Sequence, residues 1–426
     1  MNAGEARPRV HLTEPFRALR NKTFRWYWVS GFGATGAQGL QQFAMAWLVL
    51  DLTDGSVGQL GLVIFLQGVP LTLVALFGGV LADRYNRRNL LMISQAFTMV
   101  NLAILSFLTI AEVVELWEVY VSAVGLGVMQ ALTVPARQAL IRSLVHQTEM
   151  MNAVALNTIQ QHTSRIIWPA AAGGLVATVG VGATLSISAI CGAFGVVCLS
   201  MVRGSGHVAA GRGKSFLAEV VEGIRYTYET PVVSTIMSLG LGIGLLGFSF
   251  QSLAPGFARE EMGFSSAKAG FFMMSMGIGA LTGSVLFLVL DIQDRLRAYV
   301  RLCAGFAFGL AVIAVNPIGL TAFPLMATFG FFNATTSVAG LTLLQTTASQ
   351  QYLGRIISLF AVGVGVGFLL ALPIGLIGDL VGLRWPLMAL GLSFAAWALW
   401  IGKSLPAARV EAKEAPAVPT ASSSGS

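Results

Sequence analysis

The amino-acid sequence predicts an all-α integral membrane protein with twelve transmembrane helices in two six-helix bundles. Three observations lead to this prediction. Of the 426 residues, 55% are hydrophobic and 11% are charged, whereas roughly a quarter of the residues in a soluble domain are charged. The apolar residues gather in twelve long runs, and most Lys and Arg residues fall in alternate breaks between them. A water-soluble fold could not bury this much apolar side chain.

The runs themselves predict the crossings in order. They are 24–50, 57–81, 90–111, 117–135, 154–179, 182–202, 231–254, 267–290, 298–316, 318–341, 356–380 and 384–403. Most reach the roughly 20 residues that cross about 30 Å of hydrocarbon. With the N-terminus in the cytoplasm, 22 of the 26 Lys and Arg residues lie in cytoplasmic segments or at the cytoplasmic ends of the runs, as the positive-inside rule requires. We therefore expect a bacterial-type cytoplasmic (inner) membrane protein with both termini cytoplasmic.

The breaks between runs predict the domains. Residues 1–23 form a cytoplasmic segment without the apolar core of a secretory signal, and 24–202 and 231–403 form the two bundles. The linker, 203–230, has apolar residues at helical spacing opposite charged ones, which predicts an amphipathic helix at the membrane surface. A plain linker helix is the alternative. The tail, 404–426, is rich in Ala, Pro and Ser, and we expect it to be disordered.

A specific motif follows the second run, at 78–88. The residues that carry it are Gly79, Leu81, Ala82, Asp83, Arg84, Arg87 and Arg88. This stretch resembles the loop between spans 2 and 3 of the major facilitator superfamily. The resemblance implies that Asp83 joins a charge network that locks the outward-facing state, with Gly79 and the arginines completing this gate. Asn86 replaces a glycine of the family, and we expect a left-handed turn there because asparagine enters that region readily. A solvated basic loop is the alternative.

Four shorter stretches, 16–21, 135–139, 354–359 and 382–385, resemble the drug and siderophore exporters of the superfamily, including enterobactin-exporter-like proteins. Exporters of this kind carry a Gly-Pro element in span 5 for close helix packing. Pro169 and Gly173 match it, Trp168 and Ala172 stand in place of glycines, and Gly174, which follows, is a further candidate for helix packing. The alternative is that Pro and Gly are simply frequent in membrane helices.

Candidate cavity residues begin with Arg165, which lies near the bilayer midplane in the fifth run. A charge at that depth is functional by default, and His162 and Gln161 share its helix face. A structural arginine is the alternative. Polar residues at intermediate depth are Gln41, Gln130, Gln251 and Asn333. They lie on spans that line the central cavity in the family, and hydrogen bonding between helices is the equal alternative.

The resemblance implies a secondary transporter that exports an amphiphilic or aromatic small molecule by alternating access, with protons as the coupling ion. An importer or uniporter on the same fold is the alternative. We expect a monomer in the lipid bilayer, with no cofactor, metal site or nucleic-acid partner. One histidine among four lies within a run, which argues against an enzyme. No carboxylate lies deep in a run, so the proton would use His162, Asp83, Asp51, Asp379 or the substrate itself.

Overall fold

The computed structural model describes residues 16–84, 86–146, 149–202, 216–289, 294–316 and 318–404, and the secondary structure of these residues is helices joined by short turns and loops. The first half contains η1 (Arg17–Arg20), α1 (Lys22–Leu52), α2 (Val57–Arg84), α3 (Arg87–Ile110), α4 (Leu116–Leu144) and α5 (Met150–Ser200). The second half contains α7 (Pro231–Gly256), η3 (Phe257–Glu261), α8 (Ser266–Val289), α9 (Arg295–Val315), α10 (Gly319–Thr347), α11 (Gln350–Val381) and α12 (Arg384–Ser404). The predicted tail, apart from Ser404, and most of the N-terminal segment lie outside the described residues.

The helices match the predicted runs in number once α5 is counted as two crossings. Within the described residues, eight helices are long and apolar enough by themselves to cross a membrane, and α5 is 51 residues long. The sequence predicts a break between 179 and 182, and the structure instead has a sharp kink at Gly180 with φ 84° and ψ 171°. An L side chain rarely adopts this positive φ, so glycine allows the chain to reverse here without a loop.

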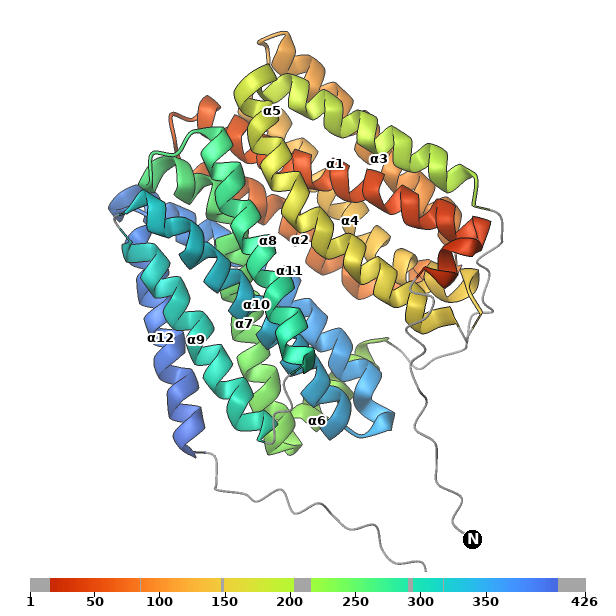
Figure 1. Cartoon of the computed structure of the whole chain (residues 1–426), viewed down its shortest axis with the longest axis vertical. Helices are drawn as coiled ribbons and strands as arrows, with labels where there is room; N and C mark the ends of the chain where they lie inside the picture. Colours follow the sequence, from red (N-terminus) through yellow and green to blue (C-terminus); the bar gives the residue numbers. More distant parts are fainter. Residues whose placement is uncertain are drawn as a thin grey trace, which may run out of the picture.

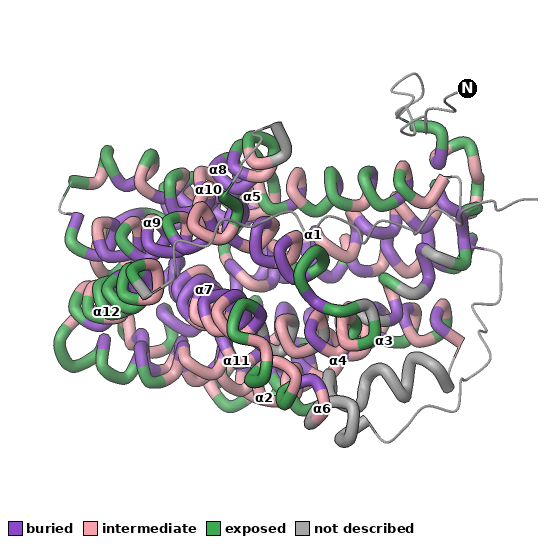
Figure 2. The backbone as a smooth tube through the Cα atoms, turned by 90° about the horizontal axis from the view of Figure 1, so that it is seen from below, coloured by how far each residue is buried: buried purple, intermediate pink, exposed green. Residues whose placement is uncertain are grey.

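The helices form two bundles that meet at one end and separate at the other (Figure 1). In the first bundle α5 packs against α1 and α3, and in the second α8 packs against α10 and α9 against α12. The halves are joined mainly along two helix pairs, α2 with α11 and α5 with α8. Buried positions follow the sides on which helices face one another, and the outer sides are exposed (Figure 2). We call the end where the bundles separate the linker end, and the end where they meet the closed end.

The linker end carries α6 (Phe216–Glu229), which packs against α11. Glu222 pairs with Arg355 at 3.0 Å, and the rings of Tyr226 and Tyr352 stack with centroids 4.4 Å apart. Ile224 and Tyr228, from the predicted apolar face, remain exposed. Glu222 and Tyr226 therefore dock α6 on α11, and these two apolar side chains face outward. Residues 203–215 of the linker lie outside the described residues.

Candidate functional site

The central feature of the site is one face of α5 that changes from exposed to buried along its length. Residues at the spacing of one helix face are Val154, Thr158, Gln161, Arg165, Ala172 and Val176. The first four, toward the linker end, are exposed, and Ala172 and Val176, toward the closed end, are buried in the core. We infer from this pattern a cleft that is open at the linker end and closed beyond Arg165.

The neighbours of α5 show that this face points into the molecule rather than toward lipid. On one side of it, Ser164 bonds to Thr35 of α1 at 2.8 Å between hydroxyl oxygens. On the other side, Ile166 lies against Gly277 of α8. The opposite side of the helix faces away from the rest of the protein, because Ile167 is half exposed and nothing lies within 4 Å of a Cβ built on Gly174. Arg165 therefore lies between the two halves of the protein.

Arg165 sits midway along the first crossing of α5, about 22 Å by helical rise from Met150. Arg165 makes no hydrogen bond or ion pair with any residue that the structure describes. By contrast, Gln160, earlier on the same helix, donates to the carbonyl oxygen of Trp28 at 3.0 Å. His162 is about 60° round the helix from Arg165 and is half-buried. The Nδ1 atom of His162 is buried and has no hydrogen-bond partner among the described residues.

The predicted amides lie nearer the closed end. A small cavity of about 20 Å³ between the halves is lined by Gln41, Gln67 and Phe368, among others, and has room for roughly one water molecule. Gln41 is buried and donates to the sulfur of Met45 at 2.8 Å. Gln67 donates to Gln130 at 3.3 Å. In this conformation these amides bond mainly within the first half, and the cavity beside Gln41 and Gln67 is too small for a substrate.

The other cavity candidates lie on the second half. Gln251 on α7 and Asn333 on α10 are both half-buried, and the Asn333 amide occupies the space beside Gly247 of α7. The aromatic residues Phe250 and Phe329 are fully buried, with ring centroids 5.0 Å apart. The structure thus brings Arg165 and Gln161 to the cleft, and places these two aromatic rings in the packed core.

The predicted gate at 78–88 is described in part. Gly79, Asp83 and Arg84 lie in α2, but the surroundings of Gly79 and the side chains of Asp83 and Arg84 are outside the described part of the structure. Arg87 is buried. Arg88 donates from Nε to the carbonyl oxygen of Leu199 at 3.2 Å and also bonds to the carbonyl oxygen of Ser200, where a cation at a helix C-terminus is favourable.

The expected left-handed turn at Asn86 is wrong. Asn86 has φ −62° and ψ 116°, and its side chain accepts hydrogen bonds from the backbone N–H groups of Arg88, at 3.0 Å, and Asn89. The residue acts as the N-cap of α3, a position that asparagine favours for this reason. The glycine of the family is therefore replaced by a helix cap rather than by a mimic of glycine.

The predicted packing element lies at the crossing of α5 and α8. A Cβ on Gly173 would lie 2.8 Å from the Cα of Gly270, and Pro169 faces the same glycine. The close packing expected here thus joins the two halves. Gly174 has no neighbour within 4 Å, so the structure contradicts a packing role for it.

The sequence analysis did not identify the pairs of residues that join the halves at the closed end. Asp379, at the end of α11, accepts hydrogen bonds from Ser56 and Val57 at the start of α2. Arg259 of η3 forms an ion pair with Asp51 of α1 and lies 5.1 Å over the ring of Trp47. The opposite charges of Arg259 and Asp51 are a signal in the sequence, but these partners become clear only when the halves are placed together.

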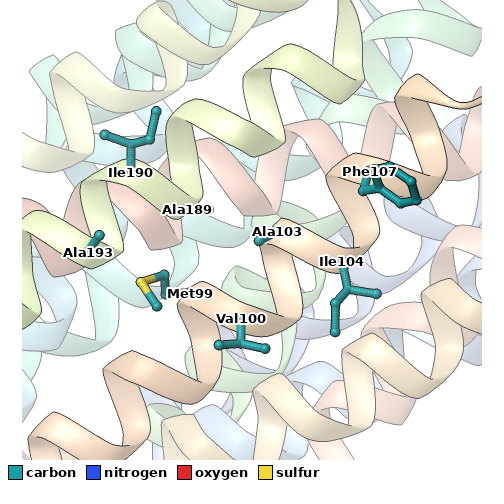
Figure 3. A pocket seen from close by; sticks show the side chains of 8 residues that line it. All are labelled: Met99, Val100, Ala103, Ile104, Phe107, Ala189, Ile190 and Ala193. Carbon is teal, nitrogen blue, oxygen red and sulfur yellow. The ribbon is translucent and has the colours of Figure 1, made fainter.

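A separate apolar crevice of about 500 Å³ lies between α3 and the second crossing of α5 (Figure 3). Its lining, which includes Phe107, Ile104 and Ile190, is apolar, and several of these side chains are exposed on the outer surface. A solute site needs polar groups that fix orientation, and this crevice has none among its lining residues. We interpret it as lipid-facing surface.

Two bundles of membrane-crossing helices around a cleft with a charged residue at mid-depth define a multi-pass membrane transporter of the major facilitator class. Solved structures support this fold. The nucleoside transporter NupG matches with a TM-score of 0.64 and 12% identity, over 90% of this chain and 98% of that one. A POT family transporter matches with a TM-score of 0.69 and 12% identity, over 89% and 95%.

The family is shown by the sequence itself. The chain belongs to the transmembrane secretion effector family, whose model matches residues 13–367. It is 26% identical to the enterobactin exporter EntS of Shigella boydii over 335 residues, which is 78% of this chain and 79% of that one. It is 28% identical to the multidrug efflux pump Tap of Mycolicibacterium fortuitum over 386 residues, or 84% and 91%. These relatives are efflux transporters rather than enzymes.

Proposed function

We propose that this protein exports an amphiphilic or aromatic small molecule, of the drug or siderophore kind, by alternating access with proton antiport. The observation that carries the proposal is the exposed Arg165 at mid-depth on the inward face of α5. A charge at this depth of a membrane protein indicates a functional site, and its place in a cleft open at one end suits solute binding. The efflux relatives favour export as the direction.

The linker end is then the cytoplasmic side, because the Lys and Arg residues gather in its segments. In this assignment the described conformation is open to the cytoplasm, where a solute enters and reaches Arg165. Release outside requires the closed end to separate, which breaks the contacts of Asp379 and Arg259. The region around Asp83 gates the cytoplasmic side. The protein works as a monomer in the inner membrane, with both termini cytoplasmic.

Few titratable side chains are placed where they could carry the proton. Every Asp and Glu that the structure describes lies at a helix end, in a loop, in η3 or in α6. His162, with its buried Nδ1, is the titratable side chain nearest to Arg165 on α5, and histidine changes its charge near neutral pH. Asp83, Asp51, Asp379 and the substrate are the other candidate carriers.

The test is proton movement in everted membrane vesicles that contain the full chain. The lumen is made acidic, and siderophores and lipophilic aromatic compounds are added one at a time while a dye reports lumenal pH. Antiport predicts that a substrate raises the lumenal pH as protons leave in exchange. Asp83→Asn should abolish the response, and Arg225→Gln, on the exposed side of α6, should retain it.

Two results would contradict the proposal. Uptake of a radiolabelled compound that is independent of the pH gradient would exclude proton antiport and favour the uniporter alternative. No uptake of any compound, with folded protein confirmed by size-exclusion chromatography, would exclude export of this chemical class.

A further inference from the structure

The charge of Arg165 has no counter-charge within the described part of its cleft. The described carboxylates lie near the membrane surfaces, at helix ends, in loops, in η3 and in α6. The exposed residues that share its face, Thr158 and Gln161, are neutral and can donate or accept hydrogen bonds. The cleft therefore presents one cation surrounded by uncharged polar groups.

This arrangement has a different free energy in the two conformations of a transport cycle. While the linker end is open, water in the cleft solvates the guanidinium. When that end closes, water must leave, and an unpaired buried charge costs several kcal/mol. A ligand that neutralises Arg165 removes this penalty, so it favours closure. A ligand shifts a conformational equilibrium by its difference in affinity for the two states.

We propose that the substrate is an organic anion whose acidic group binds Arg165, and that this pairing is what allows the loaded cleft to close. The inference rests on the proposed transport function and specifies its substrate class. A planar guanidinium binds a carboxylate through two parallel hydrogen bonds. Gln161 and Thr158 lie one and two turns nearer the opening, where they can bond to hydroxyl or carbonyl groups on the rest of the molecule.

The first test is binding of a matched pair of probes to the purified full chain in lipid nanodiscs. The probes are 2-naphthoate, an anion, and 2-naphthamide, a neutral molecule of the same shape. Because hydrogen bonds between charged groups are stronger than neutral ones, we expect wild type to bind the naphthoate about tenfold more tightly, by isothermal titration calorimetry. Arg165→Gln should remove this preference, because the variant loses more naphthoate affinity than naphthamide affinity. Arg165→Lys should keep most of it, and Arg225→Gln all of it.

The second test is closure itself. Spin labels at exposed positions of the linker end, Met151 in the first half and Ile224 on α6, which packs against α11 of the second half, should move closer when naphthoate is added to wild type and stay apart with naphthamide. An equal affinity of wild type for both probes would overturn the proposal. So would a charge preference that survives in folded Arg165→Gln. If neither probe binds, the anion site is refuted for this aromatic class, while vesicle uptake still tests transport separately.

Discussion

The carboxylate of Asp379, at the end of α11, accepts a hydrogen bond from the backbone N–H of Val57, the first residue of α2, at 2.7 Å. Its other oxygen accepts from the hydroxyl of Ser56 at 2.8 Å. A side chain of the second half therefore caps a helix of the first half. A negative charge at a helix N-terminus is favourable, so this contact stabilises the closed end and must break when that end opens.

Replacing Asp379 should therefore favour opening of the closed end. Asp379→Asn removes the charge from the N-terminus of α2, and since the site is exposed we expect a loss of about 0.5–1 kcal/mol. The open population should rise about two- to fivefold. Spin labels at Val113 and Val381, both exposed at this end, would report it as a longer distance in a variant without Cys191, Cys198 and Cys303.

Asp294→Asn is the matched control for Asp379→Asn. Asp294 also caps a helix, since it accepts from the backbone N–H of Arg297 at 3.2 Å, but both residues belong to the second half. It should leave the distance between the labels unchanged. A shift in both variants, or in neither, would show that the contact across the halves does not set this equilibrium.

The ion pair between Arg259 and Asp51 should contribute to the same closure, but weakly. Both side chains are partly exposed, at 27% and 46%, and pairs of this kind contribute about 0.2–1 kcal/mol. In a double-mutant cycle, Arg259→Gln and Asp51→Asn should each favour opening, and the double variant should open little more than either one. Strictly additive effects would refute the coupling. Arg384→Gln, which breaks a pair with Glu261 within the second half, should have no effect.

The membrane fold could be predicted from the sequence because lipid imposes long apolar runs and places Lys and Arg on one side. The depth of Arg165 follows from its position within a run. The direction in which its side chain points does not follow from the sequence, because α5 carries apolar residues on every side and so has no clear polar face. Asn86 shows a different limit: its capping of α3 depends on where the helix begins, which the motif alone does not fix.

The partners of Asp379 and Arg259 could not be predicted for a third reason. Asp379 and Val57 are 322 residues apart in the sequence, and each lies at the end of an apolar run, where a solvated charge is the ordinary interpretation. Their contact depends on how the two halves are placed together. The helices of each half can be predicted from their own residues. The placement of the two halves against each other depends on many weak contacts between distant residues.

Tyr226 should hold α6 against α11. Its phenolic oxygen accepts a hydrogen bond from the backbone N–H of Ser349 at 3.2 Å, and this bond lowers the pKa of Tyr226 below its usual value. Tyr226→Phe should weaken docking by about 0.5–1 kcal/mol and speed amide hydrogen exchange in α6 about two- to fivefold. Tyr228→Phe, at an exposed ring on the same helix, should leave exchange unchanged.

The lowered pKa of Tyr226 also predicts the sign of a pH effect. The docked helix favours the phenolate relative to the free helix, so docking should strengthen as the pH rises through the alkaline range in which tyrosine loses its proton. With exchange rates corrected for their intrinsic pH dependence, protection of α6 should increase over this range in wild type and not in Tyr226→Phe. Weaker protection at high pH in wild type would contradict the role of this hydrogen bond.

Two adjacent glycines on α5 provide the sharpest test of the crossing between the halves. In Gly173→Ala the new methyl group would meet the backbone of Gly270 and Ser266 on α8, and overpacking of this kind costs about 1–3 kcal/mol. Gly174→Ala adds the same methyl group where nothing lies within 4 Å, so it should be neutral or stabilise the helix by about 0.5–1 kcal/mol. Thermal unfolding of the purified variants should show a lower midpoint for Gly173→Ala alone. Equal midpoints would mean that α5 and α8 separate easily, and the contact at Gly173 would then not hold the halves together.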